Sequence, residues 1–268
     1  MGNGDLGVIL AGTASLLEIF LGKNEFISQD EGIPKAMSRI HLQFPALKGA
    51  SHHVEQQLLK AQVSGEFRKD QLLLQTVSWV QATDTRNNFL FTRLTLTGDR
   101  PCQGQVQCLP GADNSHNPMM HVVRDVLCQD VRADFQDQLE GFDTPRARIG
   151  VRLIGCKDRE IRDNTLFFTL HPGDVCCLMI SVVSIYDHPH YQQHAVDALL
   201  ELSAQDTDVL YTDHCAWWET FWSRSFIEIP QKDIEKECYG SLYLLACCMR
   251  GGEASPTIYG NWVMKNLR

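Results

Sequence analysis

The sequence predicts a large antiparallel β-sandwich followed by amphipathic helices, and three observations support this fold class. Apolar residues make up 44% of the 268-residue chain, which is enough to bury a sizeable core. From residue 7 to about residue 186, short alternating segments recur between turn signals, as expected of antiparallel strands with one buried face. After Asp187 the spacing of apolar residues changes from two to about 3.6, the period of a helix.

Ten strands are expected in the sandwich region. Alternation is clear at Ile40, Leu42 and Phe44, whose side chains would share one face of a strand. Gly98-Asp99-Arg100-Pro101 is typical of the turns between strands, because glycine adopts positive φ and proline fixes its own torsion. The expected strands are 7–10, 16–21, 39–44, 72–81, 89–97, 105–108, 121–128, 148–155, 165–170 and 175–185.

Two amphipathic helices are expected to follow the last strand. Pro189 stands near the first turn of one helix, and Tyr191 and Ala195 begin its apolar face at a spacing of one helical turn. The second helix has Thr207 or Asp208 as its expected N-cap, since either side chain can accept hydrogen bonds from the free N–H groups of the first turn.

A third helix is expected from 231 to 249, with a stop at Gly251-Gly252, where left-handed C-cap torsions cost little. Its first half is amphipathic. Its second half, from Leu242 to Met249, is apolar on every side, and such a helix requires neighbours all round. The residues after this helix are too few to provide them, so we expect another structure to cover it.

Charge and hydropathy argue against several classes of partner. The chain has 24 basic and 33 acidic residues, a net charge of -9 and no run of Lys or Arg, so neither nucleic acid nor an anionic membrane is expected to bind. Apolar runs such as Val175 to Val183 have about half the length that spans a bilayer. The N-terminus shows no secretory signal pattern.

The ten cysteines lie mostly inside apolar runs, which favours free, buried thiols in a reducing compartment. In the adjacent pair Cys176-Cys177, the two side chains would point to opposite faces of a strand. Cys102 and Cys108 are too far apart for a zinc pair, so neither a metal nor another cofactor is expected. Without an Asn-x-Ser/Thr acceptor in the sequence, we expect a cytoplasmic protein.

Trp217, Trp218, Phe221 and Trp222 form a single face of the second predicted helix. Packing of the helix on the sandwich is the favoured interpretation, because burying each large side chain stabilises by roughly 1.5 to 3 kcal/mol. The alternative is a platform for sugar, since an indole face can stack on a pyranose ring while its N–H donates a hydrogen bond.

The opening segment Gly2-Asn3-Gly4-Asp5-Leu6-Gly7 has the glycine spacing of a dinucleotide-binding loop. That interpretation fails on context, because no strand precedes the segment and a strand, not a helix, is expected after it. A glycine-rich turn into the first strand is the simplest alternative.

Two regions resemble glycoside hydrolases of family 95 and related (α/α)6-barrel families. The stretch from Trp217 to Ser225, followed by Ser241 to Cys248, resembles the point where a helical linker enters the barrel. The opening Gly2 to Gly7, followed by Leu21-Gly22-Lys23-Asn24, is similar to the start of the N-terminal sandwich in the same proteins. The matches occur in the same order as in those enzymes.

The resemblance implies three parts: a sandwich over 1–186, a helical linker over 187–230 and the first helix of an incomplete (α/α)6 barrel over 231–268. It also implies that the acid and base lie beyond Arg268, on barrel helices, so this portion would not be catalytic. The remainder of the barrel or a partner chain would cover Leu242 to Met249.

The resemblance further implies an inverting glycosidase, such as an α-L-fucosidase-like enzyme, with a carbohydrate ligand for the complete protein. The opening loop would face the mouth of the barrel. The residues expected near the sugar are Asn3, Asp5, Lys23, Asn24 and Trp262. Two alternatives remain open: a carbohydrate-binding or assembly module without activity, and part of a related glycoside phosphorylase.

Overall fold

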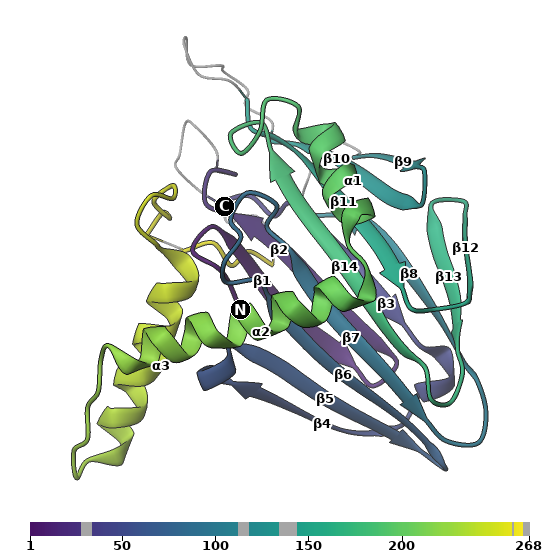
Figure 1. Cartoon of the computed structure of the whole chain (residues 1–268), viewed down its shortest axis with the longest axis horizontal. Helices are drawn as coiled ribbons and strands as arrows, with labels where there is room; N and C mark the ends of the chain where they lie inside the picture. The colour runs from purple at the N-terminus through teal and green to yellow at the C-terminus, as the bar shows by residue number, and fades with distance from the viewer. Residues whose placement is uncertain (28–33, 112–117, 134–143, 259, 265–268) are drawn as a thin grey trace.

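The computed structural model describes residues 1–27, 34–111, 118–133, 144–258 and 260–264. Within them, two antiparallel sheets pack face to face (Figure 1). The six-stranded sheet has the order β1 (Leu6–Thr13), β2 (Leu16–Lys23), β3 (Ser38–Gln43), β8 (Cys102–Pro110), β13 (Thr165–Leu170) and β12 (Asp158–Arg162). The eight-stranded sheet has the order β4 (Ser51–Gln57), β5 (Gln62–Lys69), β6 (Leu72–Val80), β7 (Leu90–Thr97), β14 (Val175–Ser184), β11 (Arg146–Ile154), β10 (Val126–Arg132) and β9 (Met119–Val123). The predicted sandwich followed by helices is confirmed.

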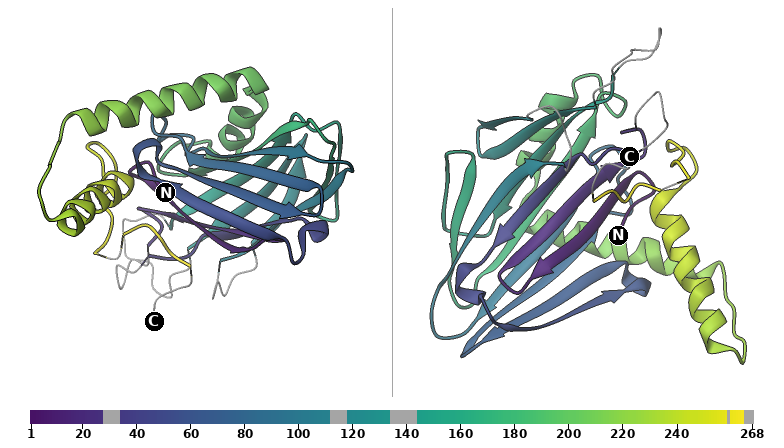
Figure 2. Two further views of the ribbon diagram at one scale, coloured as in Figure 1. Left: turned by 90° about the horizontal axis from the view of Figure 1, so that it is seen from below. Right: turned by 180° about the vertical axis from the view of Figure 1, so that it is seen from behind.

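In the described part of the chain, three α-helices follow the last strand. The helices α1 (Tyr191–Glu201) and α2 (Ala204–Ser223) lie on the outer face of the eight-stranded sheet, which forms the middle layer (Figure 1). The helix α3 (Lys232–Cys248) lies beside the sandwich at the end where the chain begins (Figure 2). Two short 3-10 segments, Pro45–Leu47 and Leu58–Lys60, flank β4.

β14 shows why the sheet needs cover on both sides. Its alternate residues Cys176, Leu178 and Ile180 belong to the core between the sheets. Cys177 and Met179 face the other way and belong to a second core under α1. A strand buried on both faces is a continuous apolar run, which explains the sequence of β14.

Three strands were missed by the sequence prediction: β4, β5 and β12. β4 and β12 are edge strands, and charged or polar residues are usual at edges because they discourage pairing with other chains. The predicted strand 121–128 is wrong as a single element. Arg124, with φ of 54°, starts a turn that divides it into β9 and β10.

Both predicted helix caps are corrected by the structure. α2 begins earlier than expected, because Ser203 accepts a hydrogen bond from the backbone N–H of Asp206, whose side chain accepts one from the backbone N–H of Ser203. α3 ends at Cys248, and its C-cap Met249 is extended, with φ of -143°, so no left-handed glycine ends this helix.

All ten cysteines are free thiols, as the sequence predicted. Seven of them are buried, including both members of the Cys176-Cys177 pair. In the described part of the chain, no helix combines the length and apolar character needed to cross a bilayer.

Candidate functional site

The opening turn, residues 2–7, is buried and held by its own side chains. Asn3 Oδ1 accepts hydrogen bonds from the backbone N–H groups of Asp5 (3.2 Å) and Leu6 (2.8 Å). Asn3 Nδ2 donates to Asn88 Oδ1 at 3.0 Å. Gly4 has φ of 97°, and a Cβ at this position would lie 2.4 Å from Arg250 Cγ, so the turn requires glycine for both torsion and space. The predicted glycine-rich turn into the first strand is confirmed.

Lys23, at the end of β2, lies among three carboxylates. Its Nζ is 2.5 Å from Asp5 Oδ2 and 2.9 Å from Asp187 Oδ1, and it also contacts Glu25 Oε1. Asp5 belongs to the opening turn and Asp187 to the connection between β14 and α1. The ammonium group therefore joins three distant parts of the chain.

Burial and charge shift the pKa values of this cluster. Burial raises the pKa of Asp5 to about 8, although the Lys23 charge opposes the shift. Burial would lower the pKa of Lys23, but Glu25, Asp5 and Asp187 together outweigh burial and raise it. Lys23 therefore stays protonated.

The spacing of this cluster does not fit acid–base catalysis of glycoside hydrolysis. Ligand oxygens of Asp5, Glu25 and Asp187 lie within 4.8 Å of one another, a spacing that suits a cation, and Lys23 Nζ is the cation they contact. Inverting glycosidases hold their carboxyl groups roughly 6.5–9.5 Å apart around a water and a sugar. We interpret the cluster as structural.

Asn24 connects the opening turn to the region around α3. Its Nδ2 lies 2.8 Å from Gly4 O, 3.0 Å from Cys248 O and 2.7 Å from Ala254 O. Asn261 Nδ2 donates to Asp5 O at 3.1 Å. The structure thus brings Asn3, Asp5, Lys23 and Asn24 together, all at most 3% exposed. Sequence reasoning missed Glu25 and Asp187; Asp187 is 164 residues from Lys23, so no local pattern could have linked them.

The tryptophan-rich face of α2 packs against the protein. Trp218 is fully buried, and its ring centroid lies 5.4 Å from that of Tyr243 in α3. Trp217 stacks on Phe221 with an angle of 8° between the rings, and the Arg250 guanidinium lies 3.8 Å from the Trp217 ring centroid. The packing interpretation is confirmed for this face.

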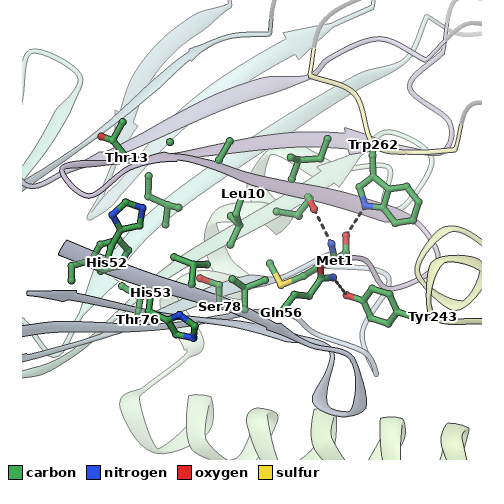
Figure 3. Close-up of a pocket in the computed structure, with 18 of the residues that line it drawn as sticks. Met1, Leu10, Thr13, His52, His53, Gln56, Thr76, Ser78, Tyr243 and Trp262 are labelled. Atoms are coloured by element: carbon green, nitrogen blue, oxygen red, sulfur yellow. Dashed lines mark hydrogen bonds between the residues drawn. The ribbon is translucent and has the colours of Figure 1, made fainter. Parts of the chain in front are cut away.

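Trp262, the fifth predicted site residue, lies apart from the buried cluster, at one end of a groove (Figure 3). Its Nε1 donates to Met1 O at 2.9 Å. The groove has a volume of about 710 Å³ and runs between β1 of one sheet and β4 to β6 of the other. Its polar lining includes His52, Gln56 and Thr76, none of which was predicted as a site residue. The first two lie on β4, which was not predicted as a strand.

Comparisons with known proteins give structural likenesses but no match in sequence. Neither a family model nor a curated protein matches the sequence. The fold is similar to that of a solved structure described as a putative kojibiose phosphorylase from human microbiome, with a TM-score of 0.56 and 10% sequence identity. The similarity covers 92% of this chain and 38% of that one. It establishes the fold alone and does not single out family 95.

Proposed function

We propose that this chain is the sandwich and linker portion of a carbohydrate-active enzyme that breaks glycosidic bonds. The order of sandwich, linker helices and α3 supports the proposal, as does the likeness to a protein whose description names a phosphorylase. In this proposal the acid and base belong to barrel helices outside the chain. Asn3, Asp5, Lys23 and Asn24 hold the opening turn toward the sugar, and Trp262 offers an aromatic face.

The two-sided apolar surface of α3 is the observation that carries the proposal. Tyr243, Ala246 and Cys247 face the sandwich and are buried. On the opposite side, Ile234 is 55% and Leu245 54% exposed, and both line one groove. A helix with apolar residues on both sides is typical of the interior of a helical assembly. We therefore propose that further barrel helices or a partner chain cover this outer face.

Two reactions fit this proposal, and their products differ. In inverting hydrolysis a carboxylic acid protonates the leaving oxygen while a base activates water on the other side of the ring. An α-L-fucosidase-like enzyme would release free sugar. In phosphorolysis, inorganic phosphate replaces the water and the product is a sugar phosphate.

A product assay tests the proposal. Protein expressed from the complete reading frame is incubated with a panel of fucosides, galactosides and glucosides, with and without inorganic phosphate. We expect free sugar or sugar phosphate from at least one glycoside, and no product from residues 1–268 alone. Absence of both products from the complete protein across the panel would contradict the proposal.

The second candidate is a carbohydrate-binding module without activity, and the groove beside Trp262 is the observation that favours it. Calorimetric titration of residues 1–268 with the same glycosides separates the two candidates. Binding at millimolar concentration or tighter, together with no product from the complete protein, would support the module.

A further inference from the structure

The strand β1 forms one edge of the six-stranded sheet and has no charged residue. The opposite edge, β12, reads Asp-Arg-Glu-Ile-Arg. Natural sheets protect exposed edges with charges, prolines or bulges, because an unprotected edge pairs with other strands. Leu6–Thr13 has none of these charges or prolines, so its sequence suits an edge that is covered.

The backbone of β1 has hydrogen-bonding groups directed away from β2. The Val8 N–H donates to Met1 O, and the Met1 nitrogen donates to Val8 O, both at 2.9 Å. Leu21, which lies opposite Val8, accepts from Met37 on its other side. Because this pattern repeats every two residues, the N–H and C=O of Leu10 also point away from β2. Within the residues that the structure describes, these Leu10 groups have no hydrogen-bond partner.

The groove beside this edge has room for side chains. Leu10 and Leu17 from one sheet and Val63 from the other are only partly buried and line it, together with Phe67. Residues Leu6, Val8 and Leu10 face the space between the sheets. A strand added next to β1 would therefore place every second side chain in the groove, since side chains alternate between faces.

We propose that β1 and the groove bind an extended polypeptide segment, antiparallel to β1, with apolar residues at every second position. Met1 and Gly2 already begin such a strand, because Gly2 forms an antiparallel bridge with Gly7 and Met1 pairs with Val8. The added segment continues this pairing at Leu10 and Gly12. Addition of a strand to a sheet edge is a general mode of peptide recognition.

The β1 side of the groove suits a peptide strand. A sugar needs free polar groups, and several of those lining the groove are bonded within the protein. Tyr243 Oη accepts from Gln56, Ser78 Oγ shares a hydrogen bond with Thr92, and Trp262 Nε1 donates to Met1 O. Among the described residues, the Leu10 N–H and C=O remain free on the β1 side of the groove, and these are the groups that pair with a peptide backbone. This inference does not depend on the proposed enzymatic function.

Titration of the ¹⁵N-labelled chain with a blocked synthetic peptide tests the inference. The probe is about seven residues long, the usual length of a strand, and alternates Val with Thr between terminal Lys residues. We expect saturable shifts of the Leu10 and Gly12 amide signals and slower exchange of the Leu10 amide proton. No saturation at millimolar peptide would overturn the proposal.

Two N-methylated versions of the peptide give a control that leaves the protein unchanged. N-methylation of alternate residues blocks one edge of the peptide, and methylation of the other residues blocks the opposite edge. We expect one version to bind at least tenfold more weakly and the other to bind within about threefold of the parent. Equal effects of the two versions would contradict strand pairing.

Variants of Leu10 test the pairing of the peptide with β1 by changing the protein. Leu10→Pro removes an N–H that does not serve the β1–β2 ladder, and edge strands tolerate proline there. We expect at least tenfold weaker peptide binding by Leu10→Pro and nearly unchanged binding by Leu10→Val, which keeps the N–H.

Shifts of the same amides by methyl glycosides would make the groove a sugar site. Concentration-dependent shifts without peptide would indicate a second copy of the chain; either result would overturn the proposal.

Discussion

At the scale of single residues, burial decides what the polar side chains do. Asn3, Asp5, Lys23 and Asn24 were predicted near a sugar, and the structure places them in a buried network that fixes the opening turn. Their contact with a sugar stays a prediction. Their sequence positions indicated that they belong together, but burial, which a single sequence does not reveal, makes their contacts structural.

His214 gives a residue-scale prediction about pH. The side chain is buried in α2 and its Nε2 lies 2.8 Å from Lys60 O, whereas its Nδ1 has no hydrogen-bond partner among the described residues. Burial is the main cause that lowers its pKa from 6.5 to about 4. As the pH falls below 6.5, His214 becomes protonated in the unfolded chain, whereas in the folded chain it stays neutral until about pH 4. The contribution of His214 to stability is therefore full above pH 6.5 and is lost toward pH 4.

This loss is at most about 3 kcal/mol. Urea unfolding at pH 7 and pH 5 measures it, with His214→Gln as the test variant because glutamine keeps a donor for Lys60 O and does not titrate. We expect His214→Gln to lose less stability than the wild type between the two pH values. The exposed His53→Gln variant should follow the wild type. If His214→Gln and the wild type lost the same free energy of unfolding between pH 7 and pH 5, the lowered pKa of His214 would be refuted.

At the scale of elements, the most informative helix is α3, because its two sides differ in what covers them. Its sequence predicted a helix with an apolar second half, and the described residues cover only the side that carries Tyr243, Ala246 and Cys247. The other side lines a shallow groove with Ile234, among other residues. We propose that further barrel helices or a partner chain occupy this groove.

Leu245→Gln tests the outer side of α3. We expect the free energy of unfolding to change by less than about 0.5 kcal/mol, because the side chain is largely exposed. We also expect less self-association, measured by size-exclusion chromatography with light scattering, because an apolar patch is removed. Ala246→Gln, on the buried side, is the matched control and should destabilise clearly. If both variants destabilise equally, the outer side is packed and the proposed cover is unnecessary.

At the scale of the whole molecule, buried polar contacts join the sandwich to the C-terminal helical region. Lys23 joins the opening turn to Asp187, which precedes α1. Asn24 joins the turn to the carbonyl group of Cys248, the last residue of α3, and to that of Ala254 beyond it. These contacts couple regions that the sequence presents as separate parts, so we expect them to unfold together.

Lys23→Met tests this coupling. Removing the ammonium leaves buried carboxylates without their counter-charge, and the expected cost is about 3–5 kcal/mol. Urea unfolding is followed by far-ultraviolet circular dichroism for the sheets and by fluorescence, to which Trp217, Trp218 and Trp222 of α2 contribute. Both midpoints should fall together. Arg68→Gln, which removes an exposed ion pair with Glu66, should leave them unchanged. A fall in only one signal would show that the two regions unfold independently.

The sequence by itself determined the fold class, the free thiols and the positions of most strands and all three helices. It did so because these features depend on local periodicity and turn residues, as β14 and α1 show. The tertiary structure decided which distant segments become neighbours. Examples are the edge positions of β4 and β12, the contact of Lys23 with Asp187, and the groove along β1. Pairing between distant segments depends on packing across the whole chain, and no local pattern encodes it.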